Sequence, residues 1–233
     1  AFTGVVIAAL LKDVIASDVI RLGLAMLGGG IVAGIASVII GIPVLRLKGD
    51  YLAIVTLAFG EIVKSLFLNS SSESFGGSLG LDTPRFDKNY LYIIALLLVL
   101  LTLAVVQNYI RSKHGRAVTA IRDNEIAARA SGINVTKYKL LTFILSAAFA
   151  GIAGVLYSYS NYTVQSMKFG YNYSIEILVM VVLGGMGSIN GSIIAAALIT
   201  YLNTKLATIL TGDLAVLQNL LYALILIGIV IYN

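Results

Sequence analysis

Residues 90–110 read YLYIIALLLVLLTLAVVQNYI, and no charged side chain interrupts them. A helix of about 20 apolar residues crosses the hydrocarbon core of a bilayer, so this stretch predicts a membrane-spanning helix. Three further uncharged apolar stretches predict spans in the same way: residues 22–45, 140–165 and 214–232. Residues 51–68 predict another span, although they include Glu61 and Lys64. The chain is therefore expected to be an all-α, polytopic membrane protein.

The composition of the whole chain supports this expectation. Hydrophobic residues make up 59% of the sequence and charged residues only 12%, and the mean hydropathy is +0.96. A soluble domain carries roughly 25% charged residues, so most of this surface must face lipid. The chain has no cysteine, which excludes a disulfide framework, a thiolate metal site and a cysteine nucleophile.

A long apolar region near the C-terminal end, residues 173–210, contains Glu176, Lys205 and a run of glycines. The glycines of this run are Gly184, Gly185, Gly187 and Gly191. Glycine within a span permits close helix packing or an unwound stretch that lines a cavity. We therefore expect a short or discontinuous helix here, followed by a full span.

The two ends of the sequence complete the predicted topology. Residues 1–11 are apolar and predict the end of a helix whose start is missing. With this helix, the chain is expected to hold about seven to eight transmembrane segments. We interpret residues 1–233 as a single transmembrane permease domain and as the core fragment of a longer protein.

Basic residues indicate the orientation. Residues 111–139 contain seven Lys or Arg and two acidic residues, a net of five positive charges, which equals the formal net charge of the whole chain. The positive-inside rule predicts that this loop is cytoplasmic, and Arg46 and Lys48 fall on the same side by counting spans. Residues 69–89 and the loop around Lys168 then lie outside. The basic residues connect spans, so we expect the lipid bilayer, and no nucleic acid, as their environment.

The cytoplasmic loop contains the sequence GRAVTAIRDNEIAARASGIN at residues 115–134. Good helix formers and natural boundary residues predict a short helix over about residues 124–131, ended by Gly132. Its small residues, Ala127 and Ala128 among them, are typical of a helix that packs into a groove on another protein. A connector lying on the lipid surface is the alternative, and the residues alone leave both open.

Two acidic residues near one membrane boundary are candidate pathway residues. Residues 46–61, RLKGDYLAIVTLAFGE, place Asp50 at the boundary and Glu61 on its apolar side. An ionisable group inside a span is a functional hypothesis by default, and this applies to Glu176 as well. The alternative for Glu61 is a structural ion pair with Lys64, three residues further along the same helix face.

The outer loop, residues 70–81, reads SSSESFGGSLGL and includes Gly76 and Gly77, which are candidate pathway or helix-break residues together with Gly184, Gly185 and Gly187. A flexible linker is one interpretation of this polar, glycine-rich segment, and a contact with an external partner is the other. The sequence contains no glycine-rich loop followed by Lys and Ser or Thr, so it has no phosphate-binding loop for ATP. The single histidine, His114, has no acidic residue at metal-ligand spacing. We predict no catalytic residue and no metal site.

Four of these segments resemble the LivM-type permease of high-affinity branched-chain amino acid ABC importers. The segments are GIPVLRLKGDYLAIVTLAFGE at residues 41–61, FGGSLGL at 75–81, GRAVTAIRDNEIAARASGINVTKYKLLTF at 115–143, and the glycine-rich break at 182–192. The resemblance covers most of the chain, and the segments follow the order found in the family.

The resemblance implies a permease without its own ATPase site, located in the plasma or inner membrane and moving leucine, isoleucine, valine or related amino acids inward. It implies three kinds of partner: a homologous LivH-type permease, two cytoplasmic ATPase subunits that bind ATP and Mg, and an extracytoplasmic amino-acid binding protein. Residues 111–139 would form the coupling loop. The residues expected to contact the ATPase are Arg122, Asp123, Asn124, Glu125, Ala127, Ala128 and Gly132.

The match to the family is loose at one point, because Ile126 interrupts the Glu-Ala-Ala order of the coupling helix. Two other functions remain open. One is a permease of the same family for urea or short amides, and the other is an ion-coupled secondary transporter that uses Glu61 or Glu176.

Overall fold

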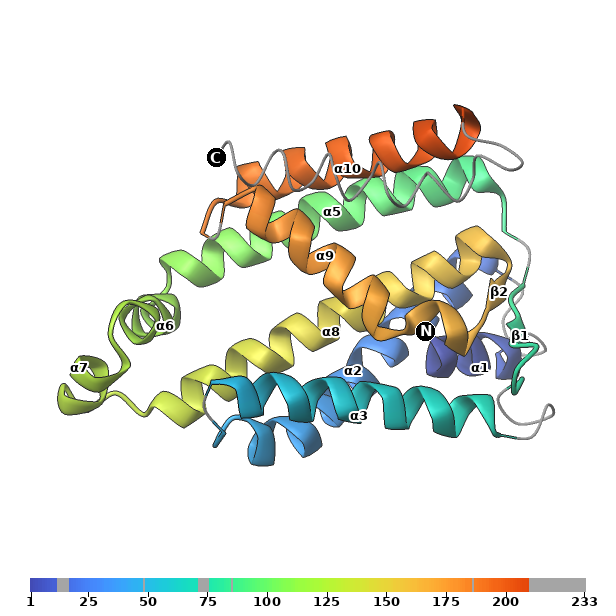
Figure 1. Cartoon of the computed structure of the whole chain (residues 1–233). Coiled ribbons are helices and arrows are strands. Elements are labelled where there is room, and N and C mark those ends of the chain that lie inside the picture. The colour runs from blue at the N-terminus through green and yellow to red at the C-terminus, as the bar shows by residue number, and fades with distance from the viewer. Residues whose placement is uncertain (12–16, 48, 71–75, 85, 186, 210–233) are drawn as a thin grey trace. The chain divides into compact units, whose positions relative to one another are not determined.

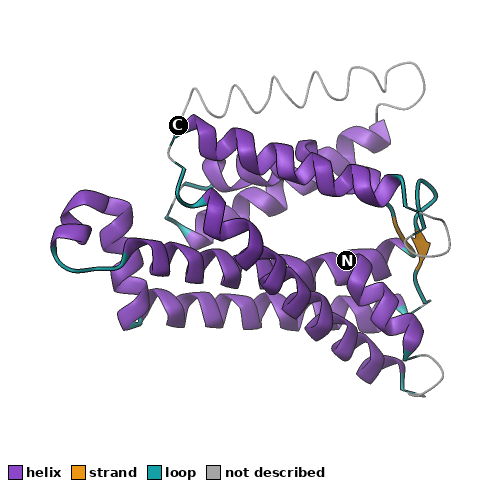
Figure 2. Ribbon diagram, turned by 90° about the horizontal axis from the view of Figure 1, so that it is seen from below, coloured by secondary structure: helices purple, strands orange, loops and turns teal. Residues whose placement is uncertain are grey.

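The computed structural model of the chain is almost entirely helical (Figures 1 and 2). The residues that it describes are 1–11, 17–47, 49–70, 76–84, 86–185 and 187–209. The predicted span at residues 214–232 lies outside the described residues. The chain divides into two compact units, Ala1–Met167 and Lys168–Asn233, and each is described by itself.

Four helices of the first unit are long and apolar enough to cross a membrane. They are α2 (Asp18–Val44), α3 (Asp50–Leu68), α5 (Lys88–Arg111) and α8 (Val135–Asn161). The predicted spans are confirmed to within about five residues at each end. The all-α, polytopic fold class is therefore confirmed. The number of seven to eight segments stays a prediction, because it includes the span at residues 214–232.

The position of α8 corrects the span predicted at residues 140–165. The helix begins earlier because the Asn134 side chain accepts a hydrogen bond from the backbone N–H of Lys137 at 3.1 Å, which caps its first turn. It ends earlier because Tyr162 adopts a left-handed conformation with φ of 59°. The Asn134 cap therefore places the start of α8 before residue 140, and the left-handed Tyr162 places its end before residue 165.

Helices α2 and α8 are packed against each other through glycines. A Cβ atom added at Gly151 of α8 would lie 2.6 Å from the carbonyl oxygen of Gly29 and 2.6 Å from the Cβ of Ala33, both in α2. A Cβ added at Gly30 would lie 3.3 Å from the carbonyl oxygen of Ala148. The backbones of the two helices therefore touch, which is the geometry that small residues permit in membrane helix pairs.

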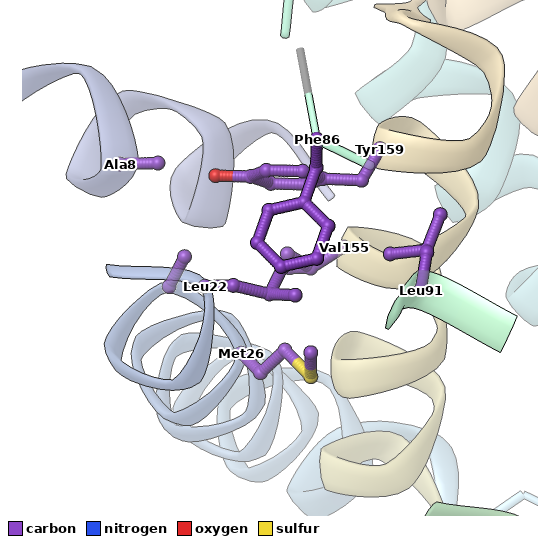
Figure 3. Close-up of a cluster of buried hydrophobic side chains, with 8 residues drawn as sticks. Ala8, Leu22, Met26, Phe86, Leu91, Val155 and Tyr159 are labelled. Carbon is purple, nitrogen blue, oxygen red and sulfur yellow. The ribbon is translucent and has the colours of Figure 1, made fainter. Parts of the chain in front are cut away.

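A hydrophobic cluster joins α1 (Phe2–Leu10) to the α2–α8 pair. Ala8, Leu22 and Val155 are fully buried within it. Phe86 and Tyr159 meet edge to face, with ring centroids 6.4 Å apart (Figure 3). The predicted helix at residues 1–11 is confirmed, and it is held by this cluster.

A two-stranded antiparallel sheet joins the loop after α3 to the segment that follows α8. Strand β1 (Leu81–Asp82) pairs with β2 (Thr163–Val164), with Leu81 opposite Val164. Thr83 adds two hydrogen bonds, from its N–H to the Tyr162 carbonyl at 2.9 Å and from its hydroxyl to the Ser158 carbonyl at 3.0 Å. Residues 81–83 and 162–164 therefore lie at the same end of the first unit, as the predicted topology requires.

The second unit contains α9 (Tyr171–Leu183) and α10 (Ile189–Ile209), which follow the short 3-10 helix η1 (Ser166–Phe169). The predicted discontinuity is confirmed between Leu183 and Ile189. A Cβ added at Gly184 would lie 2.4 Å from the Cα of Ser192. Glycine therefore lets the end of α9 touch the first turn of α10.

The α2–α8 contact predicts a position-specific effect of glycine substitution. Gly151→Ala forces a methyl group against backbone atoms that cannot rotate away, so we expect a loss of about 1–3 kcal/mol of stability. Thermal unfolding of the purified protein in detergent measures this loss. Gly23→Ala in α2 is the control, because a Cβ there meets nothing within 4 Å. Equal unfolding temperatures for the two variants would contradict the backbone contact.

Candidate functional site

Two helices, rather than the one predicted, form the loop at residues 111–139. Helix α6 (Lys113–Asp123) follows α5 directly, and α7 (Glu125–Ala130) follows α6 (Figure 1). Ser112 separates α5 from α6: its hydroxyl donates to the Tyr109 carbonyl at 2.6 Å and accepts from the Gly115 N–H at 3.2 Å. The sequence interpretation found α7 and missed α6.

Asn124 makes the corner between α6 and α7. Its side-chain oxygen accepts hydrogen bonds from the backbone N–H groups of Ile126 and Ala127, each at 3.0 Å. These are two of the four donors that the start of a helix leaves unpaired. Because this cap satisfies them, a helix of only six residues can form at the surface.

Gly132 ends α7 as predicted. It has φ of 82°, a left-handed conformation that glycine adopts without steric cost. The Ile133 N–H donates to the Ala128 carbonyl and the Gly132 N–H to the Arg129 carbonyl, both at 3.1 Å. This hydrogen-bond pair is the Schellman motif. It turns the chain sharply from α7 toward α8.

One face of α7 packs into a small hydrophobic cluster. Ala128 is buried between Ile121 of α6 and Val135 of α8, with Ile133 and Tyr138 packed around them. The predicted site residue Ala128 therefore holds the loop together and does not face outward. Ala127 lies on the exposed side.

Glu125 ties α7 to the start of α8. One carboxylate oxygen accepts from Arg129 at 3.0 Å and the other from Lys139 at 2.7 Å. Lys139 lies 14 residues further along the chain, so the second ion pair is a tertiary contact. Of the predicted site residues, Glu125 thus holds α7 in position against α8. Arg122 and Asp123 form an exposed ion pair at 3.1 Å.

Ile126 is a candidate contact residue that the sequence analysis did not include among the site residues. Its side chain is 83% exposed, more than any other large hydrophobic side chain among the described residues. A side chain that is exposed on a capped helix and enters a desolvated pocket of a partner can contribute strongly to binding. The one indication in the sequence is the position of Ile126, an apolar residue between Glu125 and Ala127 of the coupling helix.

The end of α2 lies beside this loop. Leu45 lines one pocket together with Ile121 of α6 and Lys139 and Phe143 of α8. The basic residue that follows, Arg46, is therefore at the same end of the first unit as residues 111–139. This agrees with the sidedness predicted from the positive charges.

Of the candidate pathway residues in the first unit, Glu61 is paired. Its carboxylate accepts from the Lys64 ammonium at 3.0 Å on the face of α3, which confirms the predicted pair. Asp50 is the first residue of α3, and its side chain lies outside the described part of the structure.

Gly76 and Gly77 lie in a turn and not in a helix break. Both are buried and have positive φ angles of 74° and 51°. The Gly80 N–H donates to the Gly76 carbonyl at 2.9 Å, which closes the turn beside β2. The described part of the outer loop thus forms a hydrogen-bonded turn, while residues 71–75 lie outside the described residues.

Glu176, Gly184, Gly185 and Gly187 belong to the second unit. Gly185 and Gly187 have φ of 89° and 107°, so the chain between α9 and α10 uses conformations that favour glycine. Glu176 lies within α9 and accepts a hydrogen bond from the Asn203 side-chain amide of α10 at 3.2 Å. Across the described residues, no group of three His, Asp or Glu could hold a metal ion.

Comparison with known proteins gives one family. The family described as "Branched-chain amino acid transport system / permease component" matches residues 1–232. No solved structure matches the chain.

Several curated relatives carry related names. The high-affinity branched-chain amino acid transport system permease protein LivM of Salmonella typhimurium is 41% identical over 73% of this chain, and that of Escherichia coli is 39% identical over 73%. A ribose import permease protein of Escherichia coli, RbsC, is 29% identical over 56% of the chain. The aligned part covers 47% of each LivM protein and 39% of the ribose permease, so the chain spans about half the length of its LivM relatives or less.

The cap at Asn124 predicts a local effect on backbone exchange. Asn124→Ala removes the acceptor for two amides, at a cost of about 1 kcal/mol to the start of α7. Hydrogen–deuterium exchange at Ile126 and Ala127 should then be about fivefold faster. Asn124→Asp keeps an acceptor oxygen and should exchange at the parent rate. Unchanged exchange in Asn124→Ala would show that the cap does not hold α7.

Proposed function

Because the chain belongs to the family of permease components of branched-chain amino acid transport systems, we propose that it is a membrane-spanning subunit of an ATP-driven importer. The proposed solutes are leucine, isoleucine and valine or related amino acids, as the names of the LivM relatives suggest. The chain is a multi-pass membrane protein. Its proposed place is the plasma or inner membrane, with residues 111–139 in the cytoplasm.

One observation carries the proposal that a partner drives transport through this loop: the exposed Ile126 on a rigidly held α7. Asn124 caps the helix, Gly132 ends it, and the Glu125–Lys139 ion pair ties it to α8. A helix free to lie on lipid has no need of this set of constraints. A cytoplasmic ATPase with an apolar pocket would receive Ile126, with Arg122 and Ala127 near the contact.

The remaining partners follow from the family. A homologous LivH-type permease is the proposed second membrane subunit, and the chain is itself 28% identical over 71% of its length to a probable LivH of Methanocaldococcus jannaschii. Two ATPase subunits would bind ATP and Mg, since the sequence lacks a phosphate-binding loop. An extracytoplasmic amino-acid binding protein would dock at the opposite end, beside β1 and β2.

Two other functions compete with ATP-driven import of amino acids. A permease for urea or short amides is the first alternative, because the residues of the loop at 111–139 do not identify the solute. The match to ribose import permeases adds that related chains are named for another solute. An ion-coupled carrier using Glu61 is less favoured, because Lys64 already neutralises that carboxylate.

The function is tested with the full-length permease co-purified with its permease partner, the ATPases and the binding protein. In liposomes that contain ATP, we expect uptake of radiolabelled leucine, and no uptake when ATP is replaced by a non-hydrolysable analogue. Urea uptake without leucine uptake would overturn the amino-acid assignment. Leucine uptake driven by a proton or sodium gradient without ATP would overturn the ABC assignment.

The docking role of Ile126 makes a sharper prediction. Ile126→Asp should remove the ATPases from the purified complex, because a hot-spot side chain is worth about 2 kcal/mol or more, roughly 30-fold in affinity. Co-purification and leucine uptake measure this loss. Ile126→Val is the matched control, since it keeps an apolar side chain and should retain the ATPases. Full retention by Ile126→Asp would exclude Ile126 from the interface.

A further inference from the structure

Glu176 differs from the other carboxylates that the structure describes near the membrane. It is the only charged residue between Lys168 and Lys205, and it lies near the middle of α9, a helix of 13 residues whose second half, from Ile177 to Leu183, is entirely apolar. A charged side chain inside a bilayer is costly, by about 2.5–3.5 kcal/mol on insertion scales, unless it is paired or lines a cavity. We therefore expect a group near Glu176 that offsets the charge of its carboxylate.

The paired carboxylates elsewhere in the described structure have a basic side chain as partner, from their own helix or from a neighbouring helix. Asp18 pairs with Arg21, Glu61 with Lys64, and Glu125 with both Arg129 and Lys139. Glu176 receives only a neutral amide, from Asn203 at 3.2 Å. Lys205 is the nearest basic residue along α10, and its ammonium lies over the Tyr201 ring, 5.7 Å from the ring centroid.

The contact with Asn203 uses one carboxylate oxygen of Glu176, Oε1. Within the described residues the other oxygen, Oε2, has no hydrogen-bond partner, and it is not among the fully buried polar atoms that lack one. Oε2 therefore remains accessible to a donor from outside the chain. The amide of Asn203 fixes the carboxylate while leaving its negative charge uncompensated.

The chemistry of this acceptor favours an ammonium group over a metal cation. Hard cations such as Ca²⁺ take six to eight oxygen ligands, and no group of three acidic or histidine side chains among the described residues could supply them. An ammonium group presents N–H donors that a single carboxylate can accept. Val179 and Met180 lie three and four residues after Glu176 and therefore on the same face of α9, where they suit a ligand that combines a cation with an aliphatic side chain.

We infer that the carboxylate of Glu176, oriented by Asn203, binds the α-ammonium group of the transported amino acid within the membrane. This inference rests on the proposed function, because it takes the solute to be an amino acid. It assigns Glu176 as a solute-binding residue and Asn203 as a positioning residue. The binding protein would still select the solute, while Glu176 would favour zwitterionic amino acids during passage.

The test compares three permeases in the complete transporter, reconstituted with ATP and the binding protein: the parent, Glu176→Gln and Glu176→Asp. Glu176→Gln keeps an acceptor for Asn203 and removes only the charge. We expect leucine uptake to fall roughly 30-fold or more in Glu176→Gln, as for the loss of one member of a charged contact. Glu176→Asp should recover part of the uptake.

Two further measurements separate solute binding from a structural role. Subunit composition on purification and the thermal unfolding temperature of the complex should equal those of the parent in both variants. Loss of the permease partner from Glu176→Gln would overturn the inference, because Glu176 would then pair with a basic residue of that partner. Parent-level uptake by Glu176→Gln, or equal loss in both variants, would also overturn it. Failure of the parent transporter to take up leucine would instead refute the proposed function.

Discussion

The direct contact between the backbones of α2 and α8 is the constraint on which the first unit depends. Lipid offers no hydrophobic drive for helix association, so helices in a membrane are held by close packing. Gly29, Gly30 and Gly151 remove the side chains that would separate the two helices. The cluster of Leu22, Val155 and Tyr159 then forms around the contact and also fastens α1 (Figure 3).

This contact places α8, and α8 in turn connects both ends of the unit. Its first turns hold Lys139, which binds Glu125 of α7. Its last turn leads through Tyr162 into β2, which pairs with β1. A continuous helix of 27 residues is about 40 Å long. A displacement of α7 would therefore reach the opposite end of the first unit through one rigid element.

The acidic side chains near the membrane differ in the partners that they have. Most acidic groups in the described residues near the membrane are neutralised locally, and such pairs stabilise the assembly without need of a ligand. Glu61 belongs to this class because of Lys64. Glu176 differs because its partner is the neutral amide of Asn203. The same residue type thus has a structural role on α3 and is a candidate for solute binding on α9.

Sequence alone predicted the fold class, the approximate spans, the glycine break and the end of α7 at Gly132, and the structure confirmed them; the cytoplasmic side of the basic loop stays a prediction from its charge. These features depend on local composition, because span length, charge and glycine conformation act over a few residues. The resemblance to LivM-type permeases also came from contiguous segments, and the family match confirmed it.

Only the tertiary structure decided what individual side chains do. It turned Ala128 inward against Ile121 and Val135, left Ile126 exposed, and joined Glu125 to Lys139. It also paired β1 with β2 and moved both ends of α8 from their predicted positions. The physical reason is that burial, ion pairing and helix capping depend on which residues meet in space, and residues such as Glu125 and Lys139 are separated along the chain.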